Sequence, residues 1–103
     1  MTRIVTLDTE TTGISHRLGH RVIEIGAVEL VDGRITGRQF HTYVQPQRAV
    51  DWGAQQVHGI SDAMLVGKPL FAHKAAELLE FVRGAEVIAH NATFDTGFLD
   101  NEL

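Results

Sequence analysis

Two runs of branched and aromatic residues, at positions 22–31 and 35–44, are separated only by Asp32, Gly33 and Arg34. Runs of this composition favour extended strands. An aspartate followed by glycine between them predicts a tight hairpin turn, because glycine tolerates the positive φ that such turns need. The two strands are therefore expected to be antiparallel neighbours, which commits this part of the chain to a sheet.

The other segments supply further strands and helices. Residues 3–8 and residues 86–90 are short runs of strand-forming residues. Residues 45–68 contain proline and glycine without a sustained period, so we expect a loop with one or two helical turns. Residues 70–83 are expected to form an amphipathic helix packed on the sheet. Its apolar residues recur at helical spacing, namely Phe71, Ala75, Leu78, Leu79 and Val82.

The end of the chain predicts a second helix. Thr93 is the expected N-cap, and the helix is expected to run from Phe94 onward. No stop signal closes it, so the chain is expected to end inside an element. With 44% hydrophobic and 21% charged residues, the composition is that of a soluble globular protein. We therefore predict one α/β domain over residues 1–103, incomplete at its C-terminal end.

Composition narrows the chemistry. Cysteine is absent, so disulfides and thiolate zinc sites are excluded, and any bound metal needs oxygen or imidazole ligands, which favours Mg²⁺ or Mn²⁺. The formal net charge is -4, from 13 acidic and 9 basic residues. A negative protein does not bind nucleic acid through its net charge alone. No signal peptide or membrane-length apolar run is found, so a cytoplasmic location is expected.

The first chemically informative segment is the end of the first strand. Asp8 and Glu10 are two residues apart, and because side chains alternate along a strand, both carboxylates can point to one side. Thr11, Thr12 and Gly13 follow as a polar turn whose hydroxyls and backbone N–H groups could meet a nucleotide. The alternative interpretation of such a short acidic pair is an ordinary solvated strand end.

The second informative segment follows the fourth strand. Asp95 is expected in the first turn of the last helix, where the helix dipole favours a carboxylate. Ordinary helix N-terminal chemistry explains this residue equally well. If the first and fourth strands are neighbours, however, Asp8, Glu10 and Asp95 meet at one edge of the sheet. Three such oxygen ligands suit a hard divalent cation.

One local basic cluster lies between these segments. His16, Arg17, His20 and Arg21 follow the polar turn closely. Short charge runs of this kind are usually solvated, so a solvated loop is expected here.

Both acidic segments resemble motifs of a known nuclease superfamily. The sequence DTETTG at residues 8–13 and the sequence HNATFDTGFL at residues 90–99 are similar to the first and second motifs of the exonucleases named for four acidic residues, the DEDD superfamily. The similarity also covers residues 22–46, 57–62 and 83–103. It is greatest to the members that proofread DNA for bacterial replicative polymerases.

This resemblance implies a ribonuclease H-like mixed sheet, with three antiparallel strands, a helix, a fourth strand and a helix, truncated before the last strand and helix. It implies hydrolysis of the terminal phosphodiester at a single-stranded DNA 3′ end by two divalent ions, Mg²⁺ or Mn²⁺. Polymerase core subunits are the implied partners. The implied catalytic and metal-binding residues are Asp8, Glu10 and Asp95. The implied substrate-binding residues are Thr11, Thr12, His58, Asn91 and Phe94.

Several of these positions have a simpler interpretation. His58 without the resemblance is a loop histidine, and Phe94 and Phe98 are equally suited to the core. Two departures from the family pattern also matter. Trp52, Gly53 and Ala54 stand where relatives usually have Pro-Glu-Ala, so the acidic contact to the terminal sugar that the resemblance implies is not expected here. The third motif, a histidine followed five residues later by an aspartate, is missing.

The spacing of His90 and Asp95 imitates that third motif by coincidence, since both residues occupy second-motif places. Two alternatives to DNA proofreading remain open. An RNA-trimming member of the superfamily usually has methionine where this chain has Thr11. A truncated, catalytically incompetent fragment that binds metal or nucleic acid would keep the first two motifs without the third.

Overall fold

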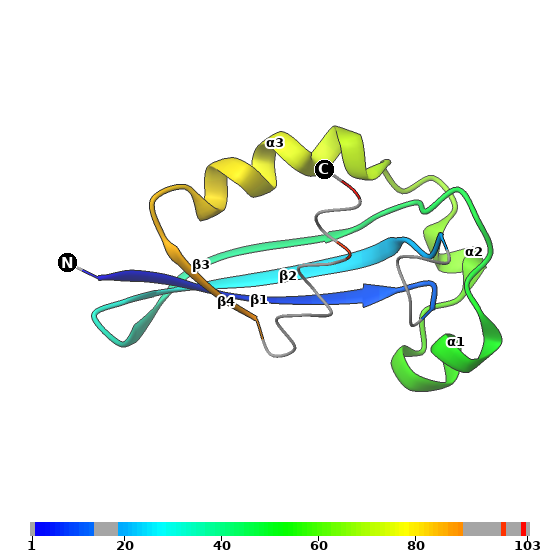
Figure 1. Ribbon diagram of the computed structural model, residues 1–103, viewed down its shortest axis with the longest axis horizontal. Coiled ribbons are helices and arrows are strands. Elements are labelled where there is room, and N and C mark those ends of the chain that lie inside the picture. Colours follow the sequence, from blue (N-terminus) through cyan, green and yellow to red (C-terminus); the bar gives the residue numbers. More distant parts are fainter. Residues whose placement is uncertain (1, 14–18, 90–97, 99–101, 103) are drawn as a thin grey trace.

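A four-stranded mixed sheet forms the centre of the protein. The computed structural model describes residues 2–13, 19–89, 98 and 102. Its strands are β1 (Arg3–Thr11), β2 (Val22–Val31), β3 (Arg34–Tyr43) and β4 (Glu86–Ala89), in the order β3-β2-β1-β4 (Figure 1). The first three strands are antiparallel, and β4 lies parallel to β1. The predicted α/β architecture is confirmed, and the first and fourth strands are neighbours, which was the condition for bringing their ends together.

The turn between β2 and β3 has the predicted hairpin geometry. Asp32 and Gly33 both have positive φ, 51° and 81°. Positive φ at two successive turn residues matches the right-handed twist of the flanking strands, which is why this kind of turn dominates short hairpins. The turn sets the pairing of the adjoining residues, while a register shift between Val28 and Leu30 separates them from the pairs nearer the acidic strand end.

Three helices complete the described part of the fold. The segment expected to be mostly loop contains α1 (Trp52–His58) and α2 (Asp62–Leu65), while α3 (Phe71–Val82) is the predicted amphipathic helix. Helix α3 covers one face of the sheet (Figure 1). The prediction that its apolar residues all pack on the sheet is wrong for Leu79, which is 50% exposed. None of the described helices is long and apolar enough to cross a membrane.

The main core lies between α3 and the sheet. The buried residues of this cluster are Val5, Leu7, Val22, Ile25, Ala27, Val44, Phe71, Leu78 and Phe98. Phe98, which the sequence suited to either core or substrate groove, is buried with only 1% exposure. The other residues of the expected last helix lie outside the described residues, apart from Glu102.

A register shift at Glu10 and Thr11 divides the core into two clusters. Glu10 pairs with Glu24, whereas Thr11 pairs with Val22, so one residue of β2 is bulged. In a regular strand Val22 and Ile25, three residues apart, would face opposite sides, and the bulge changes this alternation so that both lie in the main core. Val22 enters the main core, while Ile23 packs with Val50, Ile60 and Leu65 under α1 and α2. The bulge therefore lets the helical end of the molecule attach beside the acidic strand end.

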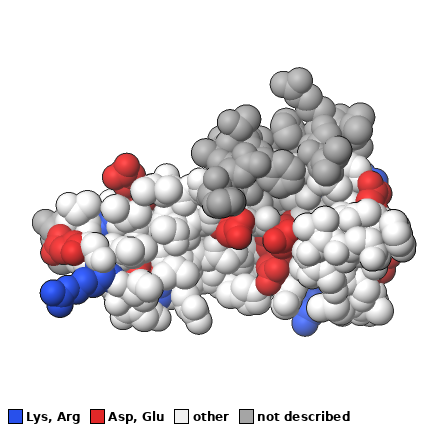
Figure 2. All heavy atoms as spheres, turned by 90° about the horizontal axis from the view of Figure 1, so that it is seen from below, with Lys and Arg blue, Asp and Glu red and all other residues white. Residues whose placement is uncertain are grey.

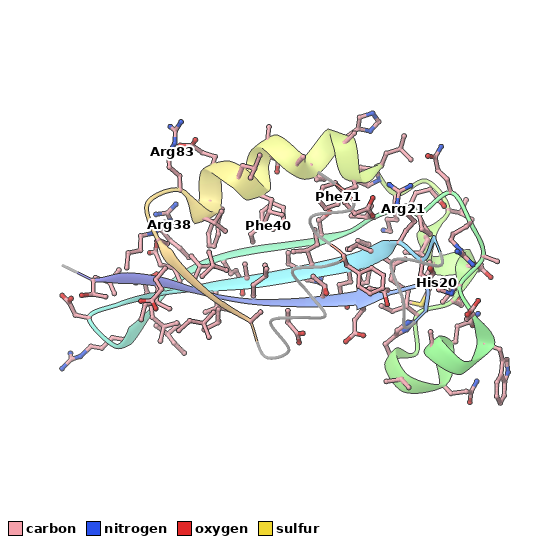
Figure 3. The ribbon with its side chains drawn as sticks, in the orientation of Figure 1. His20, Arg21, Arg38, Phe40, Phe71 and Arg83 are labelled. Atoms are coloured by element: carbon pink, nitrogen blue, oxygen red, sulfur yellow. The ribbon has the colours of Figure 1, made fainter. Side chains whose placement is uncertain are left out.

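At the end of the sheet away from the acidic residues, a buried carboxylate on β2 is linked to α3 through Arg3. Glu29 is 3% exposed and accepts hydrogen bonds from Arg3 Nε at 2.5 Å, Thr36 Oγ1 at 2.8 Å and Arg38 Nη1 at 3.1 Å. Arg3 also donates to the carbonyl oxygens of Phe81 and Arg83, at the end of α3. Figure 3 shows Arg38 and Arg83 at this end of the molecule.

The hydrogen bond from Arg3, followed by that from Thr36, holds the pKa of Glu29 below its ordinary value of 4.5, against the opposing effect of burial. A lowered folded-state pKa stabilises the protein above the unfolded value, and this stabilisation is lost as the pH falls through the folded value. Glu29→Gln is therefore expected to lower the free energy of unfolding at pH 7, with the difference from wild type shrinking as the pH falls below 4.5.

Urea unfolding of both proteins between pH 7 and pH 3 measures this difference. Glu80→Gln is the matched control, because Glu80 is 73% exposed and pairs only with the equally exposed Arg83 among the described contacts. Exposed ion pairs contribute little to folding stability, so the free energy of unfolding of this control should match that of wild type at every pH. A constant difference between Glu29→Gln and wild type across the range would contradict the assignment.

Candidate active site

The carboxylates of Asp8 and Glu10 lie on the sheet face opposite α3. Val5 and Leu7 of β1 are buried in the main core, whereas Asp8 is exposed and Glu10 partly exposed. The alternation of side chains along a strand explains this pattern. The prediction that both carboxylates share one face is therefore confirmed.

A small pocket lies at this strand end. It has a volume of about 170 Å³ and is lined by Asp8, Thr9, Glu10, Glu24 and Gly26. Gly26 is the cross-strand partner of Asp8, and Glu24 is the partner of Glu10. The absence of a side chain at Gly26 leaves space beside the Asp8 carboxylate. The pocket is thus bounded by acidic side chains, with a glycine providing room.

Glu24 is a carboxylate that sequence reasoning missed. It lies on the same face as Glu10, and its Oε2 is 2.6 Å from Nε2 of His41 on β3. The sequence did contain a signal, because Glu24 is an acidic residue within the apolar run of β2. Pairing β2 with β1 as antiparallel strands would have placed it near Glu10. His41 of β3 thus holds the Glu24 side chain, which lines the same pocket as Asp8 and Glu10.

A larger groove continues from this pocket along the open sheet face. It has a volume of about 560 Å³ and shares Asp8 and Gly26 with the pocket. Its other lining residues are Thr6, Leu7, Ala27, Val28, Gln39, Phe40, His41 and Ile88. Figure 2, which views the molecule from below, shows acidic side chains near the middle of the face. An elongated ligand could therefore lie on the sheet with one end at the carboxylates.

The described residues supply part of a metal site. No three His, Cys, Asp or Glu side chains within the described ranges are grouped closely enough to hold an ion. Asp8 and Glu10 provide oxygen donors on one face, which suits a hard divalent cation. Asp95, the predicted third ligand, lies outside the described residues, as do Asn91 and Phe94. The donor chemistry therefore fits Mg²⁺ or Mn²⁺, while the position of the third ligand stays a prediction.

Residues 11–13, which we call the 11–13 turn, leave β1 beside the pocket. Thr11 is 5% exposed, and its Oγ1 donates to the carbonyl oxygen of Gly13 at 2.5 Å. Thr12 is fully buried, and its backbone N–H donates to the Arg21 carbonyl oxygen at 2.9 Å. Both hydroxyls are engaged within the protein. The carbonyl oxygens of both threonines are engaged as well, Thr12 with the Asp51 backbone N–H at 2.8 Å and Thr11 with His58 Nε2 at 3.0 Å.

His58 is the last residue of α1, so the interpretation as a loop histidine is wrong. Its Nδ1 accepts the Ile60 backbone N–H at 3.0 Å, and its Nε2 is 3.0 Å from the carbonyl oxygen of Thr11. A carbonyl can only accept, so Nε2 carries the proton and the ring is neutral in this arrangement. His58 thereby braces the 11–13 turn, next to the place where the resemblance puts the nucleotide.

The expectation of a solvated basic cluster is wrong for His20, which is buried, while Arg21 is ion-paired with its side chain still 37% exposed. His20 is 7% exposed and its Nδ1 is 2.9 Å from Thr12 Oγ1. Arg21 pairs with Glu102, whose side chain is 1% exposed and which also accepts the Val22 backbone N–H at 3.1 Å. Figure 3 shows His20 and Arg21 together at the helical end of the sheet. His16 and Arg17 lie outside the described residues.

The fold and the acidic strand end together define a class of protein. A family model described as exonuclease matches residues 5–103, and the chain belongs to this exonuclease family. Solved exonucleases share the ribonuclease H-like fold. Exonuclease X in complex with 5′ overhanging duplex DNA superposes with a TM-score of 0.73 at 30% identity, over 92% of this chain and 52% of that one. E. coli Exonuclease I in complex with an oligonucleotide superposes with a TM-score of 0.80 at 20% identity, over 95% of this chain and 23% of that one.

Within the family, the chain is similar to a particular kind of protein, the epsilon subunit of DNA polymerase III. It is 53% identical over 107 residues to the subunit of Escherichia coli K12, covering 100% of this chain and 44% of the relative. It is 50% identical over 101 residues to the subunit of Rickettsia felis, covering 98% of this chain and 44% of the relative. The chain thus spans less than half the length of these curated relatives.

Proposed function

We propose that this chain contributes to a 3′-to-5′ exonuclease that proofreads DNA, hydrolysing the terminal phosphodiester at a 3′ end with two divalent metal ions. The observation that carries the proposal is the pair of carboxylates, Asp8 and Glu10, on one sheet face beside a pocket of about 170 Å³. The exonuclease family match over residues 5–103 and the similarity to epsilon subunits support the same activity.

The proposed metal ligands are Asp8, Glu10 and Asp95. Carboxylates that face one pocket repel each other, and a bound cation relieves this repulsion. Divalent ions held there, Mg²⁺ or Mn²⁺, would activate a water molecule and stabilise the leaving oxygen. The protein residues supply placement, because Asp8 and Glu10 are fixed by the β1 ladder and Gly26 leaves space next to them.

The proposed substrate is a single-stranded 3′ end. A mispaired terminus frays, so it reaches a single-strand site at a lower cost of unpairing. The groove that shares Asp8 with the pocket gives room for the chain of nucleotides behind the terminal one. We place the terminal nucleotide against the 11–13 turn, His58, Asn91 and Phe94. Because both nitrogens of His58 are bonded to backbone groups, its contact with a nucleotide would use the ring face, and it is a poor candidate for the general base.

Charge on the described surface fits binding through metal ions. Arg21 is paired with Glu102, and acidic side chains lie near the middle of the face shown in Figure 2. Electrostatic attraction to phosphates would therefore come from bound cations more than from basic residues. DNA is preferred over RNA because Thr11 stands where RNA-trimming relatives usually have methionine. Other polymerase III core subunits are the proposed partners, in the cytoplasm.

We predict that a polypeptide of these 103 residues alone has little or no nuclease activity. The general base that the resemblance implies belongs to the third motif, which is absent from residues 1–103. A positioned base typically contributes about 10²–10⁴-fold in rate. Degradation of a 3′-mismatched primer with Mg²⁺ or Mn²⁺ measures this activity.

The informative comparison is a chimera in which the third-motif region of the E. coli epsilon subunit follows Leu103. Activity restored in the chimera and absent after Asp8→Asn would support the proposed exonuclease. Comparable turnover by residues 1–103 alone would show that another group serves as the base. A chimera that folds, binds Mn²⁺ and remains inactive on DNA and RNA would favour the incompetent binding fragment instead.

A further inference from the structure

Thr12 is the centre of a buried hydrogen-bond network that the proposed chemistry does not use. All of its polar atoms are engaged. Its N–H donates to the Arg21 carbonyl oxygen at 2.9 Å, and its carbonyl oxygen accepts the Asp51 N–H at 2.8 Å. Its Oγ1 accepts the Arg21 N–H at 3.0 Å and lies 2.9 Å from His20 Nδ1. Thr12 therefore cannot change position without breaking bonds to two separate segments, one containing His20 and Arg21 and the other containing Asp51.

The partners of His20 determine the direction of these hydrogen bonds. Nε2 of His20 is 3.2 Å from Oδ2 of Asp51, and a carboxylate can only accept, so Nε2 carries a proton. In the neutral ring Nδ1 then accepts the hydroxyl proton of Thr12. The hydroxyl in turn accepts the Arg21 N–H. Every group in this series is satisfied, which is the condition under which a buried polar network gives rigidity.

Asp51 connects the network to α1. It is the residue before Trp52, at the N-cap position of this helix, and its own N–H binds the Thr12 carbonyl oxygen. At the other end of α1, His58 binds the Thr11 carbonyl oxygen. The two ends of one short helix therefore hold two successive residues of the 11–13 turn.

Gly13 brings the His20 ring into direct contact with the turn. A Cβ atom at this position would collide with three ring atoms of His20. The imidazole consequently packs on the Gly13 backbone while it binds the neighbouring threonine. Because of this close approach, the backbone conformation of the turn depends on the His20 ring, which is only 7% exposed.

We propose that His20, held by Asp51, is a positioning residue for the nucleotide-binding turn: through Thr12 and Gly13 it fixes the 11–13 backbone against which the 3′-terminal nucleotide lies. This inference rests on the proposed function for the identity of the ligand. The inference distinguishes two parts of the site, the carboxylates and the 11–13 turn. The carboxylates are set by the β1 ladder, whereas the turn is set by the His20 network, so loss of His20 impairs nucleotide binding and spares metal binding.

The test uses four variants of the 103-residue chain. His20→Ala removes all contacts of the ring. His20→Asn keeps an acceptor near the place of Nδ1 and loses Asp51, while His20→Gln reaches toward Asp51 and loses Thr12. Gly13→Ala displaces the ring without changing His20. The probes are thymidine 5′-monophosphate and a short oligothymidylate in the presence of Mn²⁺, together with Mn²⁺ alone and the thermal unfolding midpoint.

We expect His20→Ala, His20→Gln and Gly13→Ala to raise the nucleotide Kd about tenfold, equal to about 1.4 kcal/mol. His20→Asn should restore binding to within about threefold of wild type, because the acceptor for Thr12 is kept. Mn²⁺ affinity should not change in any of them. His73→Ala, on the exposed side of α3, is the control and should match wild type in every measurement.

Amide hydrogen exchange at Thr12 and Gly13 provides a second measurement that needs no nucleotide. Exchange should become faster in His20→Ala and return toward wild type in His20→Asn. Unchanged exchange together with unchanged nucleotide affinity in His20→Ala would overturn the positioning role. If wild type binds Mn²⁺ but no nucleotide, the proposed function fails, and exchange alone then decides whether His20 fixes the turn. An Mn²⁺ affinity that falls with nucleotide affinity would also overturn the proposal, since the two parts would not be separate.

Discussion

Replacing Asp8 with asparagine is expected to weaken Mn²⁺ binding by at least about 10- to 100-fold, the range found when groups that merely support a metal ligand are lost. Asparagine has nearly the same size as aspartate and keeps one acceptor oxygen. The change therefore removes the negative charge and leaves the β1 ladder intact. Asp8 faces the pocket beside Gly26, and the pocket's other carboxylates are Glu10 and Glu24. Isothermal titration with MnCl₂ measures the effect. Wild-type affinity should itself be weak, because few carboxylates share the ion.

Asp32→Asn is the matched control for this experiment. Asp32 lies in the hairpin turn with a φ of 51°, which asparagine tolerates, and it is far along the sheet from Asp8. It removes the same charge from the protein and should leave Mn²⁺ affinity unchanged. Glu10→Gln should behave like Asp8→Asn, and the Asp8, Glu10 and Asp95 triple alanine variant should lose specific binding. Unchanged affinity in that triple variant would reject the metal assignment altogether.

Phe98→Ala is expected to cost about 3–5 kcal/mol of folding free energy, the usual range for a large aromatic residue deleted from a core. Phe98 is 1% exposed and belongs to the main core with Val5, Phe71 and Leu78. Small domains have only about 5–15 kcal/mol of net stability, so this one change should remove a large part of it. Equilibrium unfolding in urea, followed by circular dichroism, measures the loss.

Trp52→Ala is the control, because Trp52 is an aromatic residue of comparable size that is 75% exposed at the start of α1. Its removal leaves no buried cavity and should change the free energy of unfolding by less than about 0.5 kcal/mol. A result in which both variants lose similar stability would mean that Phe98 is not part of the core. Phe98→Leu should recover part of the loss, since much of the buried volume is kept.

The strand and helix positions could be predicted because the relevant signals are local. Alternation of side chains gave the shared face of Asp8 and Glu10, and Asp32-Gly33 gave the hairpin. Helical spacing gave α3 in the same way, although Leu79 is exposed because the stripe that contacts the sheet is narrower than the apolar stripe of the sequence. Each of these properties depends on residues within a few positions of one another.

The basic cluster shows where local reasoning ends. His20 and Arg21 are charged or polar residues in a short run, and the usual expectation for such a run is solvation. Their partners are Asp51, which is distant in sequence, and Glu102, which is separated from Arg21 by 81 positions. No local pattern predicts these pairs, because they form only when Asp51 and Glu102 come to lie beside the start of β2.

The sequence alone therefore determined the sheet elements, helix α3 and the shared face of the two carboxylates of β1, and it predicts oxygen ligands for a metal ion. Only the tertiary structure decided that Glu24 pairs with Glu10, that Thr12 is buried, and that His20 and His58 both bind the 11–13 turn, His20 through Thr12 Oγ1 and His58 through the Thr11 carbonyl oxygen. The physical reason is the range of the interactions. Backbone geometry repeats every two or 3.6 residues and is visible in the sequence, whereas these contacts depend on a β-bulge and on the packing of distant segments.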